Sequence, residues 1–274
     1  MKLKYKKSKT SDVSILLSNT YLTYYWIGFL MADGHFTSRL LTVLSHKRDK
    51  KHLIKLKKYL KIKHISIERK KYPCLYGYSS YLLPLINKKF DLNNRKTYIP
   101  PNSNIFKKMK NNLFLCLFIG YIDGDGSINQ KTGRNDFSII IRNHKNWFNV
   151  MRIWIDKLST IINIKIPNPK IYDKKVCQTA INNKKVILFL KSQIKKFKIP
   201  YLNRKWDKII YIKTFHKKNE KEYSFISPKG KIYYCRGLKD FATKYNLDAS
   251  SLSAISKGKR KSCNGGWKNN NIKY

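Results

Sequence analysis

The feature that most constrains the fold is a nine-residue apolar segment that occurs twice. The first copy, Trp26–Gly34, reads WIGFLMADG, and the second copy, Phe118–Gly126, reads FIGYIDGDG. Aligning Asp33 with Asp125 places the two copies 92 residues apart (125 − 33). Because self-similarity at a fixed spacing indicates a duplicated structural unit, we expect two similar halves.

The residues after each copy predict the same succession of elements. β-prone runs predict strands, and apolar residues at helical spacing predict amphipathic helices. Strands are expected near 40–45, 64–70 and 74–79, then near 137–142, 169–174 and 176–181, and helices near 50–62, 81–90, 145–162 and 185–194. The apolar segments are themselves predicted as helices, with N-caps at Asn19 or Thr20 and at Asn111 or Asn112. Each half therefore reads as helix, two strands, helix, two strands, helix, an α+β pattern.

Small residues lie four positions apart in both predicted motif helices. They are Gly28 with Ala32 in the first helix and Gly120 with Gly124 in the second. Glycine inside a helix costs about 1 kcal/mol relative to alanine, so its presence needs a structural reason. Small residues on one face allow two helix backbones to approach closely. We expect these two helices to pack on each other; the alternative is two unrelated core helices.

Both motif helices end in an aspartate. Asp33 and Asp125 occupy the last turn, where the helix dipole disfavours a carboxylate by about 0.3–1 kcal/mol. Packing the helices side by side brings the carboxylates together and adds mutual repulsion. Divalent cations relieve that repulsion, since Mg²⁺ prefers carboxylate and phosphate oxygens. The pattern predicts a site for Mg²⁺ or Mn²⁺ that performs phosphodiester hydrolysis.

The charge of the chain indicates its partner. Lys and Arg number 59 against 15 Asp and Glu, which gives a net charge of +44. A compact fold with this excess is expected to meet a polyanion, and the spread of basic residues favours nucleic acid over a membrane surface. Some lysines are expected to be ordinary solvated surface.

Apolar length and cysteine usage bear on the compartment. The apolar run at 113–122 is ten residues long, too short to span a bilayer. Five cysteines, an odd number with no CxxC pair, predict neither a disulfide framework nor a zinc site. We therefore expect an intracellular, reducing location, without distinguishing organelle, virus-infected cell or prokaryotic cytoplasm.

The two apolar segments resemble the motifs of single-chain LAGLIDADG homing endonucleases. The resemblance covers roughly residues 15–215 and includes the segment Leu202–Asp207. It implies a monomer with a duplicated αββαββα unit, pseudo-twofold symmetry and two antiparallel sheets that bind double-stranded DNA. It also implies cleavage of both strands with 3′ overhangs, for intron or intein homing. The acid at the eighth motif position is the metal ligand, here Asp33 and Asp125. The sixth position, Asp123 in one motif and Met31 in the other, is structural.

The resemblance also implies further site residues. A basic catalytic residue is expected near the end of the last strand, which is Lys184 in the second half, while Ser79 or Ser80 occupies that region in the first. Arg39 and Arg142 are expected to contact DNA. His46 and Asn143 are candidates for the water network of the site, with a solvated surface position as the alternative for each.

The C-terminal residues predict a separate module. The halves are expected at 1–108 and 109–215, a polar linker at 216–222, and a small, mainly helical module at 223–274. Helices at 237–245 and 249–257 form a helix-turn-helix outline that resembles the modular DNA-binding repeats of intron-encoded nucleases. The alternative is a helical cap with a charged rim. The residues expected to contact DNA are Ser250, Ser251, Ser253, Lys257, Lys259, Arg260 and Lys261.

Two other functions remain open for this sequence. The first is an RNA maturase that assists intron splicing on the same scaffold, in which case RNA is a partner. The second is a non-catalytic DNA-binding regulator. Retention of both motif aspartates favours the nuclease.

Overall fold

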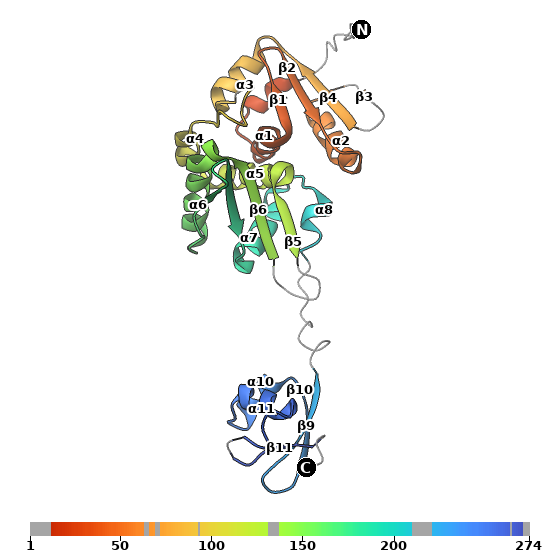
Figure 1. Ribbon diagram of the computed structural model, residues 1–274. Helices are drawn as coiled ribbons and strands as arrows, with labels where there is room; N and C mark the ends of the chain where they lie inside the picture. The colour runs from red at the N-terminus through yellow and green to blue at the C-terminus, as the bar shows by residue number, and fades with distance from the viewer. Residues whose placement is uncertain are drawn as a thin grey trace. The chain divides into compact units, whose positions relative to one another are not determined.

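The computed structural model describes residues 12–62, 66–68, 72–92, 94–130, 137–209, 221–263 and 265–270. The chain divides into two compact units, Met1–Ile210 and Tyr211–Tyr274. Each unit is described by itself below (Figure 1). The linker expected at 216–222 lies largely outside the described residues.

The first unit contains the same element order twice. The first half consists of η1 Val13–Leu17, α1 Tyr21–Asp33, β1 Gly34–Phe36, β2 Leu40–Leu44, η2 Lys47–Asp49, α2 Lys50–Tyr59, β3 Ser66–Glu68, β4 Tyr72–Tyr78 and α3 Leu82–Phe90. The second half consists of α5 Asn111–Asp125, β5 Ser127–Gln130, β6 Phe137–His144, η3 Lys145–Trp147, α6 Phe148–Ile162, β7 Lys170–Tyr172, β8 Val176–Ile181, α7 Lys184–Phe197 and α8 Asn203–Trp206. A short helix, α4 Ser103–Lys108, lies between them. The predicted αββαββα duplication is confirmed.

The two sheets have the same topology. Their strand orders are β1-β2-β4-β3 and β5-β6-β8-β7, and all neighbouring strands are antiparallel. On β6 the residues Phe137, Ile139 and Ile141 are buried, while Arg142 is exposed. This alternation packs one face of the sheet on the helices and leaves the other face uncovered.

Helices α1 and α5 pack backbone against backbone at the centre of the first unit (Figure 1). A side chain added at Gly28 would overlap the carbonyl oxygen of Leu117, and one added at Gly120 would overlap that of Tyr25. Glycine is needed at both positions because any larger residue would push the helices apart. One hydrophobic core runs through both halves; its largest buried side chains include Trp26, Trp147, Trp154 and Trp206.

The helix starts only partly match the prediction. Thr20 caps α1 by accepting a hydrogen bond from the Thr23 amide at 3.1 Å, as expected. The expected caps of α5 are wrong: Asn111 is already helical, and Lys110 stands at the cap position without a side-chain hydrogen bond. Helices α2 and α6 each begin after a short 3-10 turn. The His46 and His144 side chains cap these turns by accepting from the amides of Arg48 and Asn146.

The second unit contains a three-stranded sheet and two helices. Its elements are β9 Glu222–Ile226, β10 Ile232–Arg236, α10 Leu238–Lys244, α11 Ala249–Ser256 and β11 Lys268–Asn269, with strand order β10-β9-β11. Phe225, Phe241, Leu252 and Trp267 form its core. The expectation of a mainly helical module is corrected here. Alternating residues of the β9–β10 hairpin supply one side of that core, so the sheet is an integral part of the unit.

None of the helices in the described part of the chain is long and apolar enough to cross a bilayer.

Candidate active site

The two motif aspartates lie at the same end of the central helix pair. Asp33 is the last residue of α1 and Asp125 the last residue of α5. Gly28 lies against Leu117, and Gly124 lies against Ala32, so the two helices run in the same direction. Strand β1 begins with the residue after Asp33, and β5 begins two residues after Asp125. The carboxylates therefore lie where the two sheets start.

Both carboxylates reach solvent, yet their hydration is incomplete. The pKa of Asp33 is raised to about 6 by desolvation and then by the negative charge of Asp125. The pKa of Asp125 is also raised, mainly by desolvation. Two acids that resist ionisation next to each other form a site that gains stability when a cation binds.

Two lysines lie behind the acids and cap the motif helices. The Lys96 Nζ donates to the carbonyl oxygens of Leu30 and Ala32 at 3.1 and 2.6 Å. The Lys205 Nζ donates to the carbonyl oxygens of Ile122, Asp123 and Gly124 at 2.8, 2.6 and 2.9 Å. The carbonyl groups of Leu30 and Ile122 also accept from the amides of Gly34 and Gly126, whereas the other three are ones that a helix C-terminus leaves unpaired.

The same lysines tune the charge of the site. Burial lowers the pKa of each ammonium to about 8. Their positive charges in turn lower the pKa of Asp33 and Asp125, opposing the effect of desolvation. Sequence reasoning missed both lysines. The available signal was a second repeat, Leu92-Asn93-Asn94-Arg95-Lys96 against Leu202-Asn203-Arg204-Lys205.

The two acids are supported differently. Asp125 accepts a hydrogen bond from the Tyr121 hydroxyl, and the Asn143 amide donates to the Tyr121 oxygen at 2.5 Å. The position equivalent to Tyr121 in α1 is Phe29, which has no hydroxyl. Asn143, a predicted network residue, thus reaches Asp125 through Tyr121, whereas His46 caps the 3-10 turn η2.

Asp123, at the sixth motif position, is buried and fully engaged. It accepts hydrogen bonds from the Tyr25 hydroxyl at 2.6 Å, the Leu202 amide at 3.0 Å and the Trp206 indole at 2.7 Å. These contacts fix the segment that carries Lys205. Met31, at the equivalent position of α1, is packed in the core.

The carboxylates of Asp33 and Asp125 fit a divalent cation that takes its remaining ligands from other groups. Across the described ranges there is no group of three or more His, Cys, Asp or Glu side chains suited to a metal. Asp33 and Asp125 offer two hard carboxylates whose pKa values are raised by the protein. Mg²⁺ commonly uses one or two carboxylates and takes its remaining ligands from water and substrate phosphate.

The other predicted site residues lie on the surface around the acids or away from them. Lys184 is the first residue of α7, after the Asn183 cap, and its catalytic role stays a prediction. Arg39 is exposed in the turn between β1 and β2. The Arg142 guanidinium donates to the Gln178 side chain on the adjacent strand at 2.6 Å, on the uncovered face of the second sheet.

In the second unit, the expected DNA-contacting residues surround α11. Asp248 caps this helix by accepting from the amides of Ser250 and Ser251 at 3.3 and 2.8 Å, and it also accepts from the Ser250 hydroxyl. Ser251 and Ser253 are half-buried. The basic residues that follow the helix are exposed; they are Lys257, Lys259, Arg260 and Lys261.

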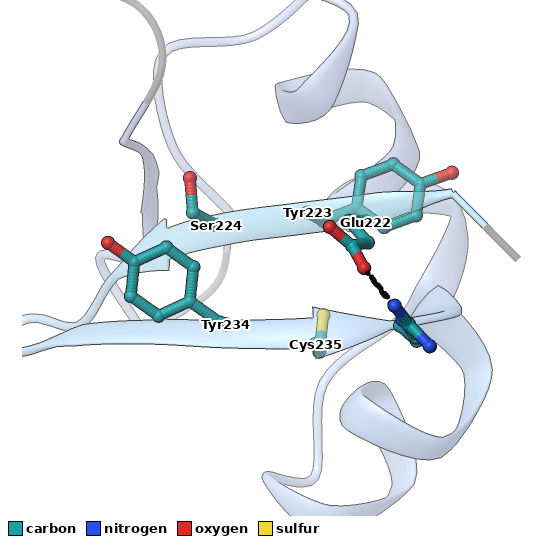
Figure 2. Close-up of a pocket in the computed structure, with 6 residues that line it drawn as sticks. Glu222, Tyr223, Ser224, Tyr234 and Cys235 are labelled. Carbon is teal, nitrogen blue, oxygen red and sulfur yellow. Dashed lines mark hydrogen bonds and ion pairs between the residues drawn. The ribbon is translucent and has the colours of Figure 1, made fainter.

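The uncovered face of the β9–β10 hairpin holds a shallow pocket of about 540 Å³. Figure 2 shows Tyr234 beside Ser224, with Glu222 toward the other end. Glu222 forms an ion pair with Arg236. The Tyr234 side chain is 79% exposed. The pocket is thus an open surface of the second unit.

Three solved structures are similar to this chain over about two thirds of its length. The LAGLIDADG meganuclease I-AabMI, bound to uncleaved DNA, is 14% identical with a TM-score of 0.44; the match covers 68% of this chain and 87% of that one. The LAGLIDADG homing endonuclease I-GzeII, in complex with its DNA target, is 12% identical with a TM-score of 0.44, covering 68% and 86%. The I-SmaMI structure with uncleaved DNA and calcium ions is 13% identical with a TM-score of 0.41, covering 66% and 86%.

The chain is similar to LAGLIDADG homing endonucleases. No protein-family model and no curated protein matches it. The fold of the first unit follows from its own repeated strand order and from the glycine-mediated contact of α1 with α5.

Proposed function

We propose that this protein is a site-specific DNA endonuclease of the LAGLIDADG type, acting as a monomer on both strands of a long target. The observation that carries the proposal is the pairing of Asp33 and Asp125 at the adjoining ends of α1 and α5. A non-catalytic regulator has no need for two adjacent acids with raised pKa values, since their repulsion costs stability.

In this mechanism each aspartate serves one strand of the duplex. Bound Mg²⁺ or Mn²⁺ would activate water for attack on phosphorus and stabilise the leaving oxygen. Asp33 and Asp125 hold the cations, while Lys96 and Lys205 keep the helix ends in place and hold the acids ionised near neutral pH. Tyr121 orients the Asp125 carboxylate. Cleavage across the minor groove leaves 3′ overhangs, in support of intron or intein homing.

The uncovered faces of the two sheets bind the DNA in this proposal. They begin beside the acids and carry polar side chains such as Arg142 and Gln178, which suit base edges in the major groove. The second unit adds contacts through α11 and the basic residues after it, of which Lys257 and Lys259 bind phosphates.

The test is cleavage of a randomised DNA library with and without Mg²⁺, followed by sequencing of the ends. We expect Mg²⁺-dependent cuts at one long sequence with 3′ overhangs. Asp33→Asn or Asp125→Asn should slow double-strand cleavage about a hundredfold or more, because each removes a metal ligand, while binding stays within about tenfold. Metal-independent cutting, or wild-type rates in both variants, would contradict the proposal.

A further inference from the structure

Each lysine of the site lies in a chain segment that is bonded to the opposite half of the first unit. Lys205 lies in α8 of the second half, and its neighbour Arg204 donates to both carboxylate oxygens of Asp49 in the first half, at 2.5 and 2.7 Å. Lys96 lies in the first half, and its carbonyl oxygen accepts from the Trp147 indole of the second half at 2.8 Å. We call Asp49 and Trp147 the crossed anchors.

The crossed anchors occupy equivalent positions of the duplicated fold. Asp49 is the last residue of the 3-10 turn η2, and Trp147 is the last residue of η3. The two turns follow β2 and β6 and are capped by His46 and His144. The same place in each half therefore reaches across to the other half, through a carboxylate in one case and an indole in the other.

Local packing does not account for either contact. Asp49 stands at the N-cap of α2, yet its side chain makes no capping hydrogen bond among the described residues. Asp49 is only 9% exposed, and a carboxylate in such a place destabilises a fold unless it is paired. The indole Nε1 atoms of Trp26 and Trp154 are buried without a partner in the described ranges, so the fold does not require every buried indole to be bonded as that of Trp147 is.

The segments that the crossed anchors hold carry cations to the motif acids. The Lys205 Nζ donates to the carbonyl oxygen that directly precedes Asp125, at 2.9 Å. The Lys96 Nζ donates to the carbonyl oxygen that directly precedes Asp33, at 2.6 Å. Burial raises the pKa of both acids, and both ammonium groups lower it. A displaced lysine would therefore disturb the placement of one acid and the electric field at both.

We propose that Asp49 and Trp147 are positioning residues for DNA cleavage, Asp49 acting on the Asp125 site through Lys205 and Trp147 on the Asp33 site through Lys96. The inference rests on the proposed function, in which each acid serves one strand. Displacing a group that orients a metal ligand lowers activity by roughly 10- to 100-fold. The two anchors are thus expected to govern opposite strands.

The test follows the two strand cuts separately, with the full-length protein and a plasmid that carries one target site. Asp49→Asn should slow the cut served by Asp125 about tenfold and leave the other cut within about twofold. Trp147→Phe should do the reverse, so the two variants accumulate circles nicked in opposite strands. Asn146→Ala removes a second contact of η3, from the Asn146 amide to the Tyr98 carbonyl oxygen at 2.7 Å, and should share the bias of Trp147→Phe.

A positioning role also requires that each anchor act through its lysine. Lys205→Met should slow the same strand as Asp49→Asn, and combining the two changes should add no further strand bias. Lys96→Met and Trp147→Phe should behave in the same way. A general loss of stability would instead slow both strands together and would add up in the double variants.

The chain offers a matched control for each anchor. Asp12→Asn makes the same change in the exposed ion pair with Lys61. Trp26→Phe shortens a buried indole that lacks a partner among the described residues, at a position where α5 has Phe118. Both controls should cut the two strands in the wild-type ratio. The proposal is overturned if the anchor variants slow the same strand, slow both strands equally, or match their controls.

Failure of the proposed function gives a different result. If the wild-type protein cuts neither strand with Mg²⁺, that function falls, and urea denaturation decides whether Asp49 holds Lys205. A loss in the free energy of unfolding that is smaller in the double variant Asp49→Asn, Lys205→Met than the sum of the two single losses supports the link. Additive losses overturn it.

Discussion

The two halves of the first unit share a backbone plan but differ in the side chains around their acids. Asp125 accepts from Tyr121, whereas Phe29 stands at the equivalent position of α1, near Asp33. Arg142 and Leu44 occupy equivalent exposed positions on the two sheets. The features shared by both halves are the glycines of the helix contact and the lysines that cap the helix ends. In the proposed function, catalysis on two strands needs the shared set, whereas an asymmetric DNA target allows the rest to diverge.

The largest expected effect tests the shared helix contact. Gly28→Leu and Gly120→Leu should each prevent folding, because the new side chain meets the backbone of the partner helix, which cannot move aside. Circular dichroism and gel filtration measure the outcome. A matched control is Gly230→Ala in the exposed hairpin turn of the second unit, where nothing lies within 4 Å of the added carbon. Its strained positive φ costs stability but leaves the first unit folded.

A second comparison concerns the capping lysines. Lys205→Met leaves the carbonyl oxygens of Asp123 and Gly124 without their donor, while Ile122 keeps the Gly126 amide, and should lower the free energy of unfolding by about 2 kcal/mol. Lys96→Met leaves one, that of Ala32, because Leu30 keeps the Gly34 amide, and should cost about 1 kcal/mol. Urea denaturation measures both. Equal and negligible losses would show that the ammonium groups do not hold the helix ends.

The sheets should differ in how they read bases. Arg142→Ala should relax the preference for guanine at one position of one half-site, by about 1–3 kcal/mol in discrimination. Leu44→Ala, at the equivalent position of the other sheet, should change specificity less, because an aliphatic side chain makes only apolar contacts such as with a thymine methyl. Cleavage of a library with single base-pair changes gives both profiles. Identical profiles for the two variants would argue that the uncovered faces do not read the target.

The smallest effect concerns pH. Cleavage should rise as the pH increases through about 6, because Asp33 has a raised pKa and binds a cation only when ionised. Tyr121→Phe removes a hydrogen bond that lowers the pKa of Asp125, so the rising part of the profile should move to higher pH. Tyr24→Phe, also on a motif helix but bonded to Asn19, should leave the profile unchanged. Single-turnover rates at fixed Mg²⁺ make the comparison.

The sequence predicted the duplication, the motif helices and most strands because these depend on local periodicity and on a repeat. It could not predict that Lys96 and Lys205 cap the ends of α1 and α5. Those contacts depend on how the chain turns back after α3 and α7. The hydrogen bonds of Asp123 to Tyr25 and Trp206 were equally hidden, since they join residues 98 and 83 positions apart. Nothing in the sequence indicated that α5 lacks a side-chain cap, because asparagine, which occurs twice at that place, is a preferred N-cap residue. Long-range partners of single polar side chains leave no pattern in one sequence.

The contact between Arg204 and Asp49 has a consequence for folding of the nascent chain during translation. These residues are 155 positions apart, and translation at about 5–20 residues per second needs roughly 8–30 s to span that interval. During this time Asp49 lacks its partner Arg204. The glycine face of α1 also remains uncovered until most of α5 has been synthesised. The amino-terminal half therefore exposes apolar surface on the ribosome until the second half has been made, and its native packing is completed only then.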